Sequence, residues 1–167
     1  MVKKIWLAAG GFWGAQKAFK LLNGVTDTVV GYANGHTENP TYREVCSDTT
    51  GFKETVEVEY DDEKISLETI LKAYFICVDP TVANAQGHDV GSQYQAGVYF
   101  TEDSDGQKVR EYFDRERRRH IRFCVECEPL RSFYPAEEYH QDYLDKNPSG
   151  YCHIGIREFQ EVLKLNG

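Results

Sequence analysis

Segments with two different hydrophobic periods alternate along this chain, and that alternation limits the possible folds more than any other feature. Runs typical of strands occupy residues 3–9, 25–32, 53–60, 94–100 and 121–128. Apolar residues at helical spacing occupy residues 12–22, 67–77, 104–119 and 158–165. Strands separated by helices predict an α+β or α/β fold. The length of 167 residues suits one domain, residues 1–167, with a sizeable core.

Charge, hydropathy and cysteine count argue against several classes of protein. The formal net charge of -8 argues against a nucleic-acid partner, because nothing in the chain offers a broad basic surface. No apolar run reaches the length of a membrane span, and the run after the basic start MVKK is too short for a signal peptide. We therefore expect a cytoplasmic protein. The five cysteines are an odd number, which argues against a closed disulfide framework and fits a reducing compartment.

The junction AAGGFWGAQ, residues 8–16, is the first candidate site. An apolar strand ends at a pair of glycines, and a helix pattern begins with Phe12 and Trp13. The free N–H groups and the dipole at a helix N-terminus stabilise an anion, so this is a favourable place for a reactive side chain. Gly11, however, has no side chain that could react.

Glu54 is the second candidate, because of its place in the alternation of residues 53–60. It shares one strand face with Val56, Val58 and Tyr60. Burial of a carboxyl on an apolar face raises its pKa, and a carboxyl that is neutral near pH 7 can donate a proton. The alternative is that Glu54, at the start of its strand, reaches water.

Tyrosine is abundant, with eleven residues, and several lie in polar, irregular segments. A cluster of their hydroxyls could bind a polar oxygen, whereas any one of them could equally serve in packing. These tyrosines are Tyr42, Tyr94, Tyr134, Tyr139, Tyr143 and Tyr151.

The cysteines give no metal site by their spacing. Cys124 and Cys127 form a single Cys-x-x-Cys, and in an extended strand their side chains would point to opposite faces. We interpret both as structural thiols and expect no metal or other cofactor. Cys152 lies in the turn-rich segment NPSGYCHIG, where a thiol could resolve a disulfide or sulfenic acid, or have no role.

Taken together, several long motifs in order resemble the A-type peptide methionine sulfoxide reductases over nearly the whole chain. They are GGFWG (10–14), GYANGHTENPTYREVCSDTTG (31–51), the Glu54 strand, QGHDVGSQY (86–94) and FYPAEEYHQDYLDKNPSGYC (133–152). The resemblance implies a two-layer α+β sandwich with a ferredoxin-like (split β-α-β) core and long coiled segments. It also implies reduction of the (S)-sulfoxide of free or protein-bound methionine, through a sulfenic acid and without a cofactor.

The resemblance implies a role for each matching residue. Phe12 and Trp13 would bind the S-methyl group, and Glu54 would protonate the sulfoxide oxygen. Tyr42 and Tyr94 would hydrogen-bond that oxygen, Asp89 would organise substrate and water, and Tyr143 would lie near the pocket. Cys152 would resolve the sulfenic acid, and thioredoxin would reduce the resulting disulfide of a monomeric enzyme.

The family motif normally reads Gly-Cys-Phe-Trp-Gly, and its cysteine thiolate attacks the sulfoxide sulfur. Position 11 is glycine here, so covalent catalysis at this position is impossible, and we predict no ordinary turnover. Three explanations are open: a cysteine or selenocysteine replaced by glycine, a pseudoenzyme that only binds methionine sulfoxide, or attack by another thiol such as Cys46. The retained site residues favour the first. We expect Gly11 to leave the fold intact and a small space over Trp13.

Overall fold

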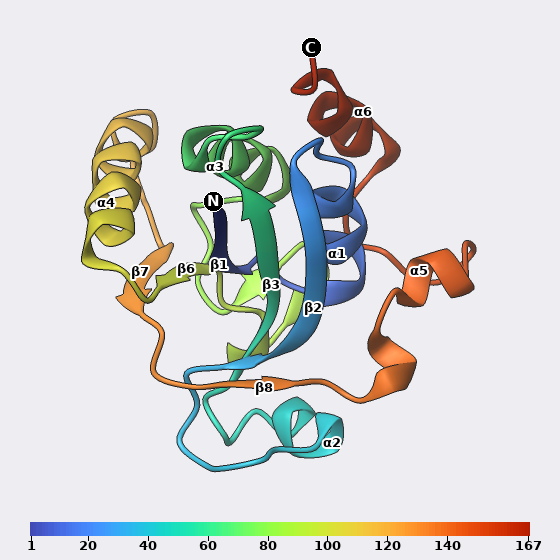
Figure 1. The fold of residues 1–167 in the computed structure, drawn as a ribbon. Helices are drawn as coiled ribbons and strands as arrows, with labels where there is room; N and C mark the ends of the chain where they lie inside the picture. Colours follow the sequence, from blue (N-terminus) through green and yellow to red (C-terminus); the bar gives the residue numbers. More distant parts are fainter.

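A computed structural model describes residues 1–167 as one six-stranded sheet with helices packed on it (Figure 1). The strands of the sheet are β1 (Val2–Ala8), β2 (Val25–Ala33), β3 (Lys53–Asp61), β6 (Gly97–Phe100), β7 (Glu126–Pro129) and β8 (Phe133–Pro135). The helices are α1 (Phe12–Lys20), α2 (Tyr42–Cys46), α3 (Leu67–Cys77), α4 (Asp103–Arg117), α5 (Tyr143–Lys146) and α6 (Ile156–Lys164). A small hairpin of β4 (Ala85–Gln86) and β5 (Asp89–Val90) stands apart from the sheet.

The order of the strands is β7-β6-β1-β3-β2-β8. Within it, β1-α1-β2-β3-α3-β6 forms the split β-α-β arrangement, because β3 lies between β1 and β2 and is antiparallel to both. The expected α+β fold with a ferredoxin-like core is therefore confirmed. β7 extends the sheet as a parallel neighbour of β6, and β8 pairs with the end of β2.

Helices cover one face of the sheet, as expected for two layers. Leu7 and Val56 are opposite each other on β1 and β3, and both belong to the main hydrophobic core. Phe12 and Phe19 of α1, together with Ile70 of α3, bury their side chains in the same core. Alternate strand residues such as Trp6 and Tyr99 form a second, smaller cluster on the opposite face, against which Leu130 and Phe133 pack.

The structure corrects several element boundaries. The irregular segment 33–52 contains α2, which begins with a capping box between Thr41 and Glu44. β6 begins at Gly97, because residues 92–94 form a 3₁₀ turn instead of the start of a strand. The Tyr-rich segment that was expected to be irregular contains β8 and α5. The final helix is Ile156–Lys164.

The prediction of a strand over 121–128 is wrong at its start, because β7 begins only at Glu126. Cys124 precedes the strand, where its N–H donates to the Pro80 carbonyl at 2.7 Å. The argument that Cys124 and Cys127 point to opposite faces of one strand therefore does not apply. Both are nevertheless free thiols, as are the other three cysteines.

The turn between β1 and α1 sets the position of the candidate site. Gly10 has φ +79, and a side chain there would bring its Cβ within 2.6 Å of Gln86 Cβ, so this position requires glycine. Gly11 has φ -54 and ψ 126, which any L-residue can adopt. The backbone therefore does not explain why residue 11 is glycine.

Candidate active site

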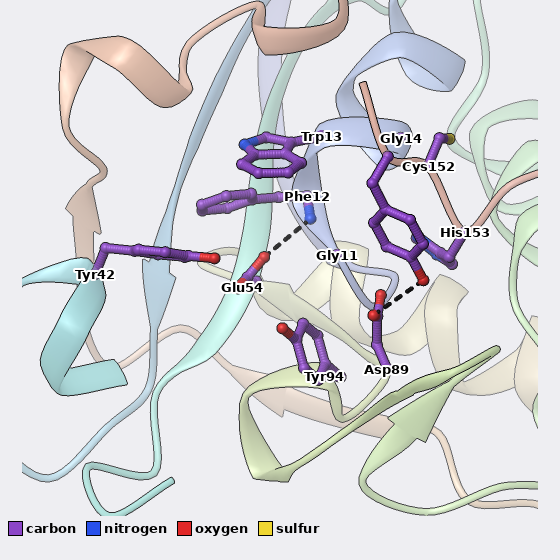
Figure 2. Close-up of a pocket in the computed structure, with 11 residues that line it drawn as sticks. Gly11, Phe12, Trp13, Gly14, Tyr42, Glu54, Asp89, Tyr94, Cys152 and His153 are labelled. Carbon is purple, nitrogen blue, oxygen red and sulfur yellow. Dashed lines mark hydrogen bonds between the residues drawn. The ribbon is translucent and has the colours of Figure 1, made fainter. Parts of the chain in front are cut away.

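A cleft with about 420 Å³ of open space lies at the start of α1, and Figure 2 shows the side chains around it. Its walls come from six separate parts of the chain. The lining residues are Gly11, Phe12, Trp13, Gly14, Tyr42, Glu54, Asp89, Tyr94, Tyr151, Cys152 and His153. Every residue to which the resemblance assigns a role lines this cleft except Tyr143, which stacks on Trp13. Tyr134 and Tyr139, from the group of tyrosines noted in the sequence, do not line it.

Glu54 is buried at the inner end of the cleft, with 3% of its surface exposed. The alternative that it reaches water is excluded by this burial. Its Oε1 accepts the Phe12 N–H at 3.1 Å, so the carboxyl lies against the first turn of α1. The pKa of Glu54 is raised to about 8, mainly by burial and also by the nearby Asp89, although the hydrogen bond from the Phe12 N–H acts to lower it. The carboxyl is therefore mainly protonated at pH 7 and can act as an acid.

Two tyrosine hydroxyls, of Tyr42 and Tyr94, point towards the Glu54 carboxyl from two different directions (Figure 2). Tyr42 is the first residue of α2, and its backbone N–H donates to Glu137 Oε2 at 3.0 Å, which fixes the start of that helix. Tyr94 ends the 3₁₀ turn after the small hairpin. Burial raises the pKa of both hydroxyls, so they stay protonated and can donate hydrogen bonds to an oxygen in the cleft.

Phe12 and Trp13 form an aromatic wall. The Trp13 Nε1–H donates to His140 Nδ1 at 3.0 Å, and Tyr143 stacks on the indole with ring centroids 3.8 Å apart. Tyr143 therefore supports Trp13 from outside the cleft. The sequence did not identify His140 as part of the site. It lies 127 positions after Trp13, and only the tertiary fold brings the two residues together.

The segment 151–153 closes the side of the cleft nearest Gly11. Tyr151 Oη donates to Asp89 Oδ1 at 3.1 Å, and His153 Nε2 lies 2.9 Å from the Ala9 carbonyl oxygen. The Ala9 contact requires the proton on Nε2, which leaves Nδ1 as the acceptor. The sequence did not identify His153 as a site residue, because only the tertiary fold places it beside Gly11.

The point where a Cβ at Gly11 would lie is 3.3 Å from Asp89 Oδ2 and 3.5 Å from His153 Nδ1. Gly11 and Trp13 line the same cleft, and Asp89 and His153 are the side chains nearest to position 11. A side chain here would require Asp89 to give way by a few tenths of an ångström. The glycine thus opens the cleft towards an acid and an imidazole.

Cys152 lies over the first turn of α1. Its Sγ is 2.7 Å from the point where a Cβ at Gly14 would lie, so Gly14 permits this close approach, one helical turn from Gly11. Burial raises the pKa of the Cys152 thiol. Cys46, by contrast, is exposed at the end of α2 and does not line the cleft.

The family model described as "Peptide methionine sulfoxide reductase" matches residues 3–166. This chain belongs to the peptide methionine sulfoxide reductase family. A relative from Lachnoclostridium phytofermentans, named peptide methionine sulfoxide reductase MsrA, is 50% identical over 163 residues, which cover 97% of this chain and 98% of that protein.

Solved structures of the family share this fold. Mxr1 from Saccharomyces cerevisiae in its reduced form has a TM-score of 0.86 and 38% identity, over 90% of this chain and 88% of Mxr1. Mxr1 in complex with Trx2 matches with a TM-score of 0.62 and 28% identity, over 85% of this chain and 84% of that chain. No helix of the present structure has the length and hydropathy to cross a membrane.

Proposed function

We propose that this chain carries the binding and acid residues of a methionine-(S)-sulfoxide reductase but lacks the attacking atom at position 11. The observation that carries the proposal is the buried Glu54 carboxyl, which lies beside Gly11 and faces two tyrosine hydroxyls. Such a site suits an oxygen that gains negative charge as its sulfur is attacked. The substrate class is methionine sulfoxide, free or within peptides and proteins.

Each side chain has a place in this reaction. The aromatic wall of Phe12 and Trp13 suits the S-methyl group, and the Tyr42 and Tyr94 hydroxyls hold the sulfoxide oxygen. Glu54 donates a proton to that oxygen. Asp89, held by Tyr151, orients the substrate and water near position 11, and Tyr143 keeps the indole in place.

With cysteine or selenocysteine at position 11, that atom attacks the sulfoxide sulfur and becomes a sulfenic or selenenic acid. Cys152 then forms a disulfide or selenosulfide with it and releases water. A thioredoxin returns both groups to the reduced state. We expect the protein to act as a monomer in a reducing, cytoplasmic compartment, which the five free thiols fit.

With Gly11, this covalent route has no starting atom. A pseudoenzyme that binds methionine sulfoxide is the second candidate, favoured by a cleft that is otherwise complete. Attack by Cys46 is the weakest explanation, since its thiol is exposed at the end of α2 and does not line the cleft.

The test is reduction of a methionine sulfoxide peptide with dithiothreitol by this chain, by Gly11→Cys and by Gly11→Ser. Serine fills nearly the same space as cysteine but cannot reduce the sulfoxide, so it is the matched control. We expect turnover only from Gly11→Cys, about 10³-fold or more above the other two. If Gly11→Cys is also inactive but binds the peptide, the pseudoenzyme is the correct reading.

A further inference from the structure

Position 11 lines the cleft and carries no side chain. Methanethiol has the same heavy atoms as the cysteine side chain that the family motif contains, and glycine frees that space. The surrounding groups are polar on one side, with Asp89 Oδ2 and His153 Nδ1 within 3.5 Å of the missing Cβ. The same cleft opens towards Glu54 and the two tyrosines that would hold a sulfoxide oxygen.

His153 is suited to take a proton at this point. Its Nε2–H is committed to the Ala9 carbonyl at 2.9 Å, so Nδ1, 3.5 Å from the Cβ point of residue 11, keeps a lone pair that can accept a proton. Burial lowers the pKa of His153, which keeps the ring neutral and able to accept. The Asp89 carboxylate nearby stabilises the imidazolium that forms when a thiol proton arrives.

We propose that Gly11, His153 and Asp89 bind a low-molecular-weight thiol of one or two heavy atoms, which attacks methionine sulfoxide in place of a side chain at position 11. This inference rests on the proposed function, because it uses the same acid and the same substrate cleft. It gives Cys152 a role in the chain as it stands, and it adds His153 as the base for the attacking thiol.

The reaction balances with the thiol as the only reductant. The thiol sulfur bonds to the sulfoxide sulfur as its proton goes to His153 Nδ1 and Glu54 protonates the sulfoxide oxygen. Transfer of that oxygen leaves methionine, reduced by two electrons, and a sulfenic acid on the small thiol, oxidised by two. The proton on His153 returns to Glu54 through solvent.

Cys152 completes the cycle. Its thiol attacks the sulfenic acid, releases water and forms a mixed disulfide with the small thiol. A second thiol molecule attacks that disulfide, which frees Cys152 and yields the symmetrical disulfide. Cys152 Sγ lies against Gly14, one helical turn from Gly11 along α1, and Cys152 lines the same cleft, so a rotation of its side chain brings the thiol to the sulfenic acid.

The first experiment measures methionine formation from a sulfoxide peptide at increasing methanethiol, with the reaction in buffer subtracted. We expect saturable turnover about 10-fold or more above that of Gly11→Val, whose side chain fills the site. The rate of Gly11→Ala, which adds only the Cβ, should lie between those of the original chain and Gly11→Val. This milder variant is the control for misfolding of the valine variant. 2-Mercaptoethanol and glutathione should be progressively poorer, because Asp89 and His153 limit the space.

The methanethiol-dependent rate of the original chain should stay far below the rate of Gly11→Cys. A tethered nucleophile can have an effective concentration of roughly 10⁵ M or more, which millimolar thiol cannot reach. His153→Phe should lower the methanethiol-dependent rate and shift its rise to higher pH, since the thiolate must then form in solution. If the rate and the pH profile of His153→Phe equal those of the original chain, His153 is not the base that accepts the thiol proton.

Mass spectrometry of the intact protein gives a second readout. An adduct of methanethiol on Cys152 should form only when sulfoxide and thiol are both present, and Cys152→Ser should abolish the adduct but not the first equivalent of methionine. If Gly11→Cys is active but methanethiol drives the original chain no faster than Gly11→Val, the thiol site is refuted and the proposed function stands. If Gly11→Cys is inactive although thiol and peptide are both bound, the thiol site and the proposed function are both refuted.

Discussion

The buried Glu54 carboxyl should make this protein less stable as pH rises, and Glu54→Gln should remove that cost. Glutamine keeps the shape and can still accept the Phe12 N–H, which lies 3.1 Å from Oε1. It cannot ionise, so the variant avoids placing a negative charge in a site that is 3% exposed. The substitution therefore separates the cost of the charge from the packing of the side chain.

The magnitude follows from the two pKa values of Glu54. The folded protein holds the pKa at about 8, compared with 4.5 for an ordinary glutamate. Below pH 4.5 both states carry the proton, and between these values the folded state binds more protons than the unfolded chain. Stability contributed by Glu54 is thus lost as pH rises, by about 3 kcal/mol at pH 7 and up to about 5 kcal/mol above pH 8.

Urea denaturation of the original chain and of Glu54→Gln at pH 5, 7 and 9 measures this loss. We expect the free energy of unfolding of the variant, relative to the original, to increase steadily over this range. Glu38→Gln, at an exposed glutamate, controls for the removal of one surface charge. A difference between Glu54→Gln and the original chain that is independent of pH would refute the burial argument.

Three further predictions test the site and its frame. In the Gly11→Cys background, kcat/KM should fall about tenfold per pH unit above pH 8 as Glu54 ionises, and a pH profile without that decline would exclude Glu54 as the acid. Gly10→Ala should lower the melting temperature through about 1–3 kcal/mol of strain at φ +79, whereas Gly11→Ala should change stability by about 1 kcal/mol or less. His140→Leu should cost about 1–3 kcal/mol in urea denaturation, because it leaves the Trp13 indole N–H without its acceptor, and an unchanged midpoint would contradict that.

Local pattern was sufficient where a residue's environment follows from its own strand or helix. The alternation of residues 53–60 placed Glu54 with Val56 and Val58, and all three are buried. Helical spacing likewise identified Phe12 and Phe19 as core residues of α1. Periodicity reports which side of an element is apolar, and that side is the one the core covers.

Local pattern failed where a distant contact decided the conformation. Residues 121–125 alternate like a strand, but the hydrogen bond from Cys124 N–H to the Pro80 carbonyl holds the chain outside the sheet until Glu126. α2 was missed within a segment rich in glycine, asparagine and proline, although its capping box was readable in the sequence. Propensity is a weak guide for elements of only four or five residues.

The sequence by itself predicted alternating strands and helices in an α+β or α/β domain, with the ferredoxin-like core implied by the family resemblance, and it placed Glu54 on an apolar strand face and glycine at position 11. The burial of Glu54 was decided by the tertiary structure. Only the tertiary structure decided that His153 and Asp89 flank that position. His153 bonds to Ala9 across 144 residues, and the order of the strands and the path of the C-terminal segment bring them together. A contact between residues so far apart depends on the whole packing, which no local period of two or 3.6 residues can encode.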